Sequence, residues 1–414
     1  LFTIYVTYPK LISHSTIISA LDTIQLGFSQ TLNTEQFSTG LSLSSAIEEN
    51  LTYDLQFLNN DQDVYIYPEN SFISGDTISL ILSADQITNA YGYGLDGNQN
   101  DVFEGSPLDN DTVTVYVNYS GDFDGNDQVD FDDLALFANG WYSKDYKYEL
   151  GPVTGDIPHF ITMTDSLFNI EDAMTFGRMW NWFVGIGKHV ITMPQLSLGG
   201  GFTTEQNGND LIIHSRASAG KRIVLQYDPE IITINREQRS LTKPTDLTFE
   251  FYADCIDSNR SEYVHYSFNE EISNVPVIFT IKSKQRNPVN ITIGVEGINE
   301  NGELILSDVI TTQFQPIPDK FEVFPNYPNP FNSQTVIEYA IPVQSDVLIN
   351  IYDLLGRKVK TLTNNRHEAK YFALVWDAKD DHGRLAASGL YFLRIVARTE
   401  SKTFIKTKKM VMIR

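Results

Sequence analysis

The sequence predicts a mainly β protein of several domains that contains one small α-helical module. The chain has 414 residues and is rich in aromatic residues that favour strands, with 21 Tyr and 25 Phe. Short segments of alternating polarity recur between turn residues along most of its length. Only one stretch, near residue 130, combines a dense acidic loop with a helical apolar period. We therefore expect a multidomain string of β-sandwiches that is interrupted by this module.

Residues 1–118 are expected to form the first β-sandwich, because four short segments alternate in polarity between turns. These segments are residues 23–28, 53–57, 64–67 and 77–82. Their order, together with the turn at residues 87–92, resembles a bacterial Ig-like domain. That resemblance implies a spacer or an adhesive module. The acidic loop Asp96–Asp101 is either a cation site or an exposed turn.

Residues 119–185 contain the acidic loop on which the functional prediction rests. If Asp122 is position 1, side-chain oxygens fall at positions 1, 3, 5, 9 and 12, and position 7 can offer a backbone carbonyl. This spacing fits the oxygen ligands of Ca²⁺ in an EF-hand type of loop. The predicted ligands are Asp122, Asp124, Asn126, Gln128, Asp130 and Asp133. The alternative is a solvated acidic turn.

Position 6 of this loop is Asp127 where such loops have Gly, and Asp tolerates the left-handed conformation better than most residues. A short helical period follows at residues 134–141. The motif therefore predicts a loop that leads directly into a helix.

A second loop–helix unit follows at residues 168–182. Aligned on the first unit, it places Asp165, Asn169 and Asp172 at positions 5, 9 and 12. Positions 1 and 3 then fall on Ile161 and Met163, which have no ligating side chain. Either this loop is empty, or Glu149 or Asp156 from the preceding insertion supplies a ligand.

Two such units in tandem, each ending in Trp, resemble a dockerin domain. The resemblance implies a small module that folds with calcium and binds a cohesin domain. The insertion at residues 142–164 is longer than is usual in that family.

Residues 186–318 return to alternating segments and predict a second β-sandwich of about 130 residues. The phrase Val224–Ile232 contains Tyr-Asp-Pro and is similar to a strand end of cohesin-like domains. An unrelated sandwich is the alternative. The module is therefore expected to dock on a cohesin-like partner either in cis, at residues 186–318, or in trans.

Residues 319–414 follow the proline-containing linker Gln315–Asp319. They carry 15 Lys and Arg against 10 Asp and Glu, whereas Lys10 is the only basic residue among residues 1–143. The phrases Tyr-Pro-Asn-Pro-Phe-Asn, Ile-Tyr-Asp-Leu-Leu-Gly-Arg and Ser-Gly-Leu-Tyr-Phe closely resemble the C-terminal sorting domain of the type IX secretion system. This resemblance implies recognition by the type IX machinery and export to the surface of a Gram-negative bacterium.

Composition and missing motifs exclude several functions. The net charge of −23 argues against nucleic acid as a partner. The sequence contains no run of 18 apolar residues, so it predicts no membrane-spanning helix. The lone Cys255 excludes an intrachain disulfide and is expected to be a small buried residue. No catalytic motif was found, and the pair Glu270–Glu271 is of the kind that arises by chance in an acidic chain.

The sequence thus predicts a secreted or cell-surface, non-catalytic, calcium-binding segment with a role in adhesion or scaffolding. Because the chain begins at Leu1 without Met or a signal peptide, we expect a piece of a longer protein. The alternative function is the accessory region of an extracellular polysaccharide hydrolase or peptidase whose catalytic domain lies upstream. A purely structural surface fibre is a third possibility.

Overall fold

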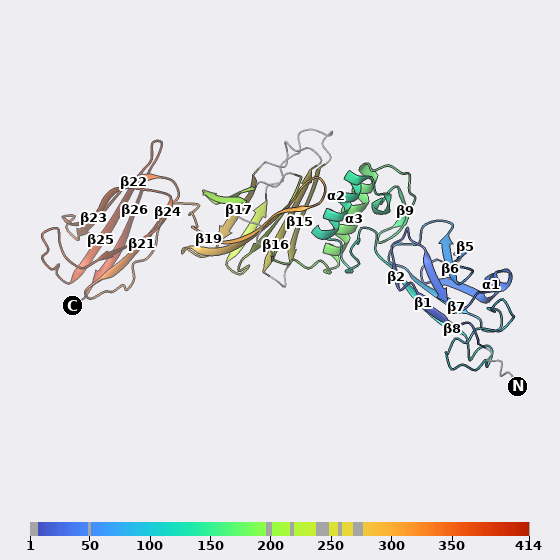
Figure 1. Cartoon of the computed structure of the whole chain (residues 1–414). Helices are drawn as coiled ribbons and strands as arrows, with labels where there is room; N and C mark the ends of the chain where they lie inside the picture. Colours follow the sequence, from blue (N-terminus) through green and yellow to red (C-terminus); the bar gives the residue numbers. More distant parts are fainter. Residues whose placement is uncertain are drawn as a thin grey trace.

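The computed structural model is mainly β, as predicted, and its elements form four groups that follow one another along the chain (Figure 1). It describes residues 7–48, 51–195, 201–215, 219–236, 248–255, 259–267 and 276–413. The pair Glu270–Glu271 lies outside these residues. The strand that contains Cys255 is described, but the surroundings of its side chain are not. No helix among the described residues is long and apolar enough to cross a bilayer.

The first group is a sandwich of two four-stranded sheets, ordered β1-β3-β6-β5 and β2-β8-β7-β4. Alternate residues of these strands point inward, so Ile24, Leu26, Ile78 and Leu80 are almost fully buried between the sheets. The strands are β1 (Leu11–His14), β2 (Ile17–Ile18), β3 (Ile24–Phe28), β4 (Leu41–Ser45), β5 (Tyr53–Leu58), β6 (Asp63–Pro68), β7 (Thr77–Leu82) and β8 (Asp111–Val117).

A short helix in this group corrects the expectation that residues 119–185 hold all the helical structure. Helix α1 (Thr34–Gly40) begins after Asn33, whose side chain accepts a hydrogen bond from the N–H of Glu35. Phe37 is fully buried. Seven residues with one buried aromatic are too few to give a helical period that the sequence could reveal.

The second group is the helical module. Its elements are α2 (Phe131–Ser143), the 3₁₀-helix η1 (Tyr146–Tyr148), the hairpin strands β9 (Val153–Asp156) and β10 (His159–Thr162), and α3 (Ile170–Gly185). Phe137 and Phe176 stack between the two long helices with their ring centroids 5.4 Å apart. The helical periods at 134–141 and 168–182 therefore correspond to α2 and α3, whereas the hairpin lies in the long insertion.

The third group packs a four-stranded sheet, β11-β12-β17-β14, against a five-stranded sheet, β15-β16-β13-β18-β19. Ile223 and Leu225 of β13 point into the core between these sheets. The other face of the five-stranded sheet is also covered, because Val264 and Tyr266 pack in the core of the helical module. The strands are β11 (Phe202–Asn207), β12 (Asp210–Ser215), β13 (Gly220–Gln226), β14 (Ile232–Arg236), β15 (Thr248–Cys255), β16 (Arg260–Ser267), β17 (Val277–Ser283), β18 (Val289–Ile298) and β19 (Leu304–Phe314).

The fourth group is a sandwich of the sheets β20-β21-β24 and β23-β22-β25-β26. Trp376 is fully buried and contacts Phe331 and Tyr391, which closes one end of the core. The strands are β20 (Glu322–Val323), β21 (Thr335–Ile341), β22 (Ser345–Asp353), β23 (Lys358–His367), β24 (Lys370–Trp376), β25 (Gly389–Arg398) and β26 (Thr403–Met412).

Candidate metal centre

Three carboxylates of the predicted calcium loop come together at the start of α2. Oxygen atoms of Asp122, Asp124 and Asp133 lie within 4.8 Å of one another. Asp122 and Asp133 are 3% and 0% exposed, whereas Asp124 faces solvent. Among the described residues, this is the only group of three or more acidic, His or Cys side chains close enough to share a metal ion.

The backbone of the loop wraps around Asp122. Its Oδ1 accepts hydrogen bonds from the N–H groups of Gly125 and Asn126, and its Oδ2 accepts one from Asp127. Asp127 has φ 64°, so it takes the left-handed conformation for which Gly is otherwise preferred at this position. The loop therefore adopts the turn that the motif requires in spite of its unusual sixth residue.

Asp130 and Asp133 join the loop to the helix. Asp130 is the N-cap of α2, and Asp133 completes a capping box by accepting the N–H of Asp130 at 2.9 Å. The second oxygen of Asp133 accepts the N–H groups of Phe123 and Asp124 at 2.7 and 3.2 Å. One buried carboxylate thus fixes both the beginning of the loop and the first turn of the helix.

Burial destabilises the ionised form of these carboxylates. Desolvation raises the pKa of Asp133 to about 8 and that of Asp122 to about 6. Desolvation also raises the pKa of Asp130 and Asp132. A divalent cation would supply the missing opposite charge, and carboxylate oxygens are among the ligands that Ca²⁺ takes.

Two of the predicted ligands, Asn126 and Gln128, use their side-chain oxygens in other hydrogen bonds. The amide nitrogen of Asn126 donates to Asp124, and its oxygen accepts the N–H of Gln128. The side chain of Gln128 turns away and binds the N–H of Val190 at 2.9 Å, so only its backbone carbonyl is available to the loop.

The second loop repeats this geometry, but the predicted alignment was wrong at positions 1 and 3. Asp172 is fully buried and accepts the N–H groups of Leu150, Gly151 and Asn169 at 2.8 to 3.0 Å. Asp133 accepts those of Phe123, Asp124 and Asp130, so Leu150 and Gly151 take positions 2 and 3. Ile161 lies instead in β10 and Met163 directly after it, because the hairpin is inserted after position 3.

Glu149 therefore occupies position 1 of the second loop, in the place of Asp122. It is 1% exposed, and its Oε1 accepts the N–H groups of Asp165 and Ser166. Its Oε2 has no hydrogen-bond partner among the described residues, and burial raises its pKa. Asp156, the other residue predicted for position 1, is exposed at the end of β9 and does not occupy that position.

The remaining predicted residues of the second loop, Asp165 and Asn169, each accept a backbone hydrogen bond within it. Asp165 accepts the N–H of Leu167 at 2.9 Å, as Asn126 does in the first loop. Asn169 is the N-cap of α3. Because position 3 is Gly151, this loop offers one side-chain ligand fewer than the first.

The helical module packs against the five-stranded sheet of the third group (Figure 1). Trp180 of α3 stacks on Phe251 of β15 with ring centroids 4.8 Å apart. At Gly302 the turn between β18 and β19 approaches α2 so closely that a Cβ atom would lie 2.0 Å from the carbonyl oxygen of Ala135. The module thus shares a continuous apolar core with this sheet.

A buried cluster of charges lies at the edge of that contact. The guanidinium of Arg222 binds the carboxylates of Glu262 and Glu296 and the carbonyl of Thr192. The imidazole of His189 binds the second oxygen of Glu262. Although burial alone would raise it, Arg222 and His189 hold the pKa of Glu262 below its ordinary value. The segment that leaves α3 is thereby fixed to β13 and β16.

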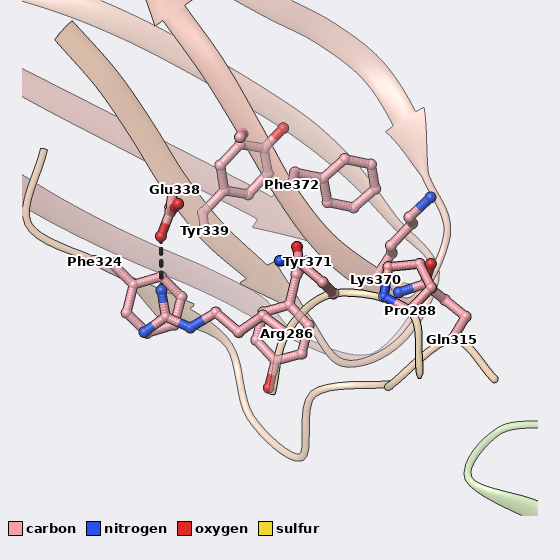
Figure 2. A pocket seen from close by; sticks show the side chains of 11 residues that line it. Arg286, Pro288, Gln315, Phe324, Glu338, Tyr339, Lys370, Tyr371 and Phe372 are labelled. Atoms are coloured by element: carbon pink, nitrogen blue, oxygen red, sulfur yellow. Dashed lines mark hydrogen bonds and ion pairs between the residues drawn. The ribbon is translucent and has the colours of Figure 1, made fainter. Parts of the chain in front are cut away.

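A smaller contact joins the third and fourth groups. Arg286 places its guanidinium 3.6 Å from the ring centroid of Phe324 and forms a 2.6 Å ion pair with Glu338 (Figure 2). These residues border a cavity of about 180 Å³ that Tyr371 and Lys370 also line. The carboxylate of Glu338 is thus already paired with Arg286, and the contact joins the third group to the fourth.

Comparisons with solved structures give no functional argument. Latent PorU from Porphyromonas gingivalis aligns at 10% identity and a TM-score of 0.21, over 97% of this chain and 32% of its own. The chain therefore spans about a third of that protein. The S-layer protein SbsC aligns at 9% identity and 0.20, over 98% and 54% of the two chains. The fragment of Escherichia coli alpha-2-macroglobulin that spans MG0-NIE-MG1 aligns at 10% identity and 0.20, over 96% of both. All these TM-scores are too low to support a shared architecture.

The comparison with protein families is specific for the fourth group. No curated protein matches the chain. Residues 326–412 match the family described as secretion system C-terminal sorting domain. This region of the chain is therefore a type IX C-terminal sorting domain, which is not catalytic and directs export to the cell surface or the extracellular space.

Proposed function

We propose that the chain is a calcium-stabilised, non-catalytic scaffold segment of an exported protein. In this proposal the helical module is dockerin-like, binds Ca²⁺ in its first loop, and docks in cis on the five-stranded sheet of residues 220–314. The sorting domain delivers the segment to the outside of the cell, where calcium is plentiful.

One observation carries the calcium assignment. Asp133 is fully buried and fixes the loop and the helix at once, yet no positively charged residue is paired with it among the described contacts. With Asp122 and Asp124 it forms a compact group of hard oxygen donors. Calcium binding would neutralise this group and so stabilise the folded loop that leads into α2.

The proposed docking rests on contacts between one face of α3 and the five-stranded sheet. Trp180 and Phe176 both contact Phe251 of the sheet. Gln128, at position 7 of the first loop, binds the segment that leads from α3 to the sheet. Ordering of the loop by calcium should therefore also order the contact between the module and the sandwich.

Hydrogen exchange measured by mass spectrometry on the whole chain tests this proposal, because it reports on each element separately. Removal of calcium by BAPTA should increase exchange in α2 and α3 and, to a smaller extent, in β15 and β16. The strands of the sorting domain, such as β25, lie at the opposite end of the chain from the first group and serve as an internal control (Figure 1). Unchanged exchange in α2 and α3 would refute the calcium assignment. A change confined to the helices would refute the coupling to the sandwich.

A further inference from the structure

We propose that the first β-sandwich binds a neutral oligosaccharide in an open groove beside the turn that carries Tyr91. The groove lies between the segments 7–10, 29–31 and 89–91. Its volume is about 640 Å³, within the range of roughly 300–1,000 Å³ that small-molecule sites occupy. This binding site goes beyond the calcium-dependent scaffold role and is built from other residues.

The lining of the groove consists of polar side chains and Tyr. None of the residues that line it has an aliphatic side chain or is Phe or Trp. Ser29 and Thr31 supply hydroxyl groups, and Gln30, Gln62 and Asn89 supply amides. Hydroxyl and amide groups both donate and accept hydrogen bonds, so they match the hydroxyl groups of a sugar. A site for an apolar ligand has a mainly hydrophobic lining instead.

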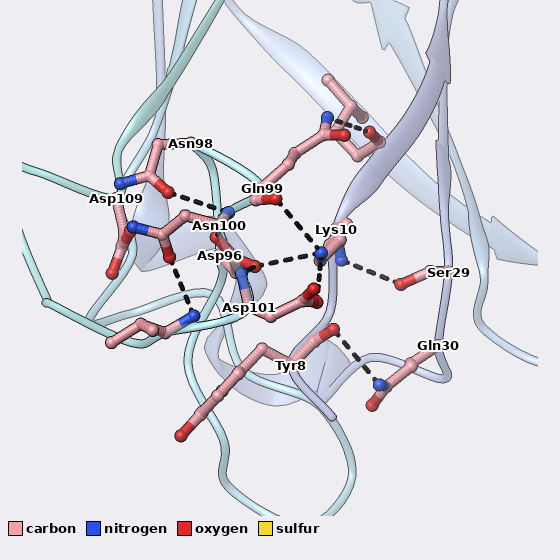
Figure 3. Close-up of polar contacts among 12 residues, drawn as sticks. Tyr8, Lys10, Ser29, Gln30, Asp96, Asn98, Gln99, Asn100, Asp101 and Asp109 are labelled. Atoms are coloured by element: carbon pink, nitrogen blue, oxygen red, sulfur yellow. Dashed lines mark hydrogen bonds and ion pairs between the residues drawn. The ribbon is translucent and has the colours of Figure 1, made fainter. Parts of the chain in front are cut away.

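The charged residues that line the groove are paired with each other. Nζ of Lys10 lies 2.6 Å from Oδ1 of Asp101 and 3.3 Å from Oδ2 of the fully buried Asp96. Figure 3 shows Lys10 between these two carboxylates and the segment that carries Ser29 and Gln30. Lys10 thereby supplies the positive charge for the acidic loop of residues 96–101. Because its ammonium is already paired, the groove favours a neutral ligand over an acidic one.

Tyr91 supplies the apolar surface that binds one face of a sugar ring. Its side chain is 86% exposed, and no ring contact is described for it. Tyr8, in contrast, stacks on Phe103 with ring centroids 5.9 Å apart. A Tyr ring combines an apolar face with a hydroxyl group, so it can pack against the C–H groups of a sugar and hydrogen-bond to a sugar hydroxyl.

Asn89 fixes both the turn of Tyr91 and the amide of Gln30. It is 2% exposed, and its Oδ1 accepts the N–H groups of Tyr91 and Tyr93 at 3.0 and 2.9 Å. Its Nδ2 donates to Oε1 of Gln30 at 2.7 Å, and Nε2 of Gln30 donates to the carbonyl of Tyr8 at 3.2 Å. The groove is therefore held in shape by its own hydrogen bonds, which lowers the entropic cost of binding.

Affinity electrophoresis of the whole chain tests this proposal. The native gels contain hydroxyethylcellulose, xyloglucan, galactomannan or soluble starch, all of which are neutral. At least one of these polymers should retard the unchanged chain, and Tyr91→Ala should weaken that binding at least about tenfold. Tyr116→Ala changes another exposed Tyr, on β8 and outside the groove, and should bind like the unchanged chain. No retardation by any of the polymers, or equal affinities of the two variants, would overturn the proposal.

Gln62→Ala provides a second test inside the groove. The side chain of Gln62 makes one long hydrogen bond, of 3.5 Å, to the carbonyl of Ser29, so its removal should leave the Tm unchanged. We expect binding about fivefold weaker, because one hydrogen bond to the ligand is lost. Unchanged binding by this variant would contradict the placement of the ligand.

The dependence on salt and on calcium identifies the ligand class and separates the two proposals. Binding of a neutral ligand should change little between about 50 and about 500 mM NaCl, because it forms no ion pairs. A steep loss of affinity with salt, or binding of polygalacturonate alone, would contradict a neutral ligand. Asp133→Asn should bind the polysaccharide like the unchanged chain, since Asp133 lies outside the groove. A failure of the calcium assignment therefore leaves this inference intact.

Discussion

The side-chain oxygen of Gln128 accepts the N–H of Val190 at 2.9 Å, although the two residues are 62 positions apart. Gln128 is position 7 of the acidic loop, and Val190 follows His189, which binds the buried carboxylate of Glu262. The loop at the start of α2 is therefore connected to the charged cluster on β13 and β16. We therefore expect that a change in the order of that loop alters the junction with the sandwich.

We expect Asp133→Asn to abolish most of the stabilisation by calcium. A ligand that binds only the native state stabilises by about 4 kcal/mol when its concentration is a thousand times Kd, and this gain requires the intact site. Differential scanning calorimetry with and without Ca²⁺ measures it. Asp156→Asn, an exposed residue of the hairpin, should respond to calcium like the unchanged chain. A full calcium response in Asp133→Asn would contradict the assigned site.

The stability of the calcium-free chain should fall as the pH rises from about 4 to about 8. Burial raises the folded-state pKa of Asp122 to about 6 and of Asp133 to about 8, above their ordinary value of 3.8. In that window the native state binds more protons than the unfolded state, so unfolding becomes easier with increasing pH. The increase in Tm on adding Ca²⁺ should therefore be larger at pH 8 than at pH 5. Calorimetry with BAPTA in large excess at each pH provides the calcium-free reference. A larger increase at pH 5 would be contrary to this expectation.

Glu149→Gln tests whether the second loop binds an ion. If Glu149 is a ligand, the variant should bind about one Ca²⁺ fewer per chain, or bind it at least tenfold more weakly, in equilibrium dialysis. Glu171→Gln changes an exposed residue in the first turn of α3 and is the matched control. If both variants bind as much Ca²⁺ as the unchanged chain, the second loop binds no ion. Glu149 would then only stabilise the fold of that loop through its hydrogen bonds.

Trp180→Ala should separate the helical module from the sandwich. Removing a fully buried Trp costs about 3–5 kcal/mol, and here the loss falls on the contact with Phe251. We expect a lower Tm for the module and a calcium response that no longer reaches β15 and β16 in hydrogen exchange. Met174→Ala, on the exposed side of the same helix, should have a small effect. Equal effects of the two substitutions would argue against a specific contact.

Arg286→Ala should loosen the junction with the sorting domain without unfolding it. The guanidinium is about half exposed, so its contacts with Phe324 and Glu338 contribute only about 1 kcal/mol. We expect faster proteolysis of the linker at residues 315–320 and an unchanged Tm for the sorting domain. Arg384→Ala removes a local pair with Asp380 within the sorting domain and should not affect the linker. Equal cleavage rates in the two variants would contradict a role for Arg286 at the junction.

The sequence alone predicted the mainly β fold, the acidic loop and the sorting domain, because each of these depends on local patterns. Alternation with period two reveals a strand with one buried face, as in β7, and oxygen ligands at fixed spacing reveal a loop. The sorting-domain phrases lie within one continuous segment that the family comparison matches. The sequence could not detect α1, whose seven residues carry too little periodicity.

The tertiary structure decided what depends on residues far apart in the chain. Glu149 takes position 1 of the second loop because a hairpin interrupts that loop after position 3, and a count along the chain cannot reveal such an interruption. The N–H of Gly97 meets the carbonyl of Asp109 only because the chain turns back between them. The contact of Trp180 with Phe251, and the pairing of Arg222 with Glu262, likewise depend on how the module packs on the sheet. Local spacing determines the turns and strands, whereas burial and charge pairing depend on which surfaces meet.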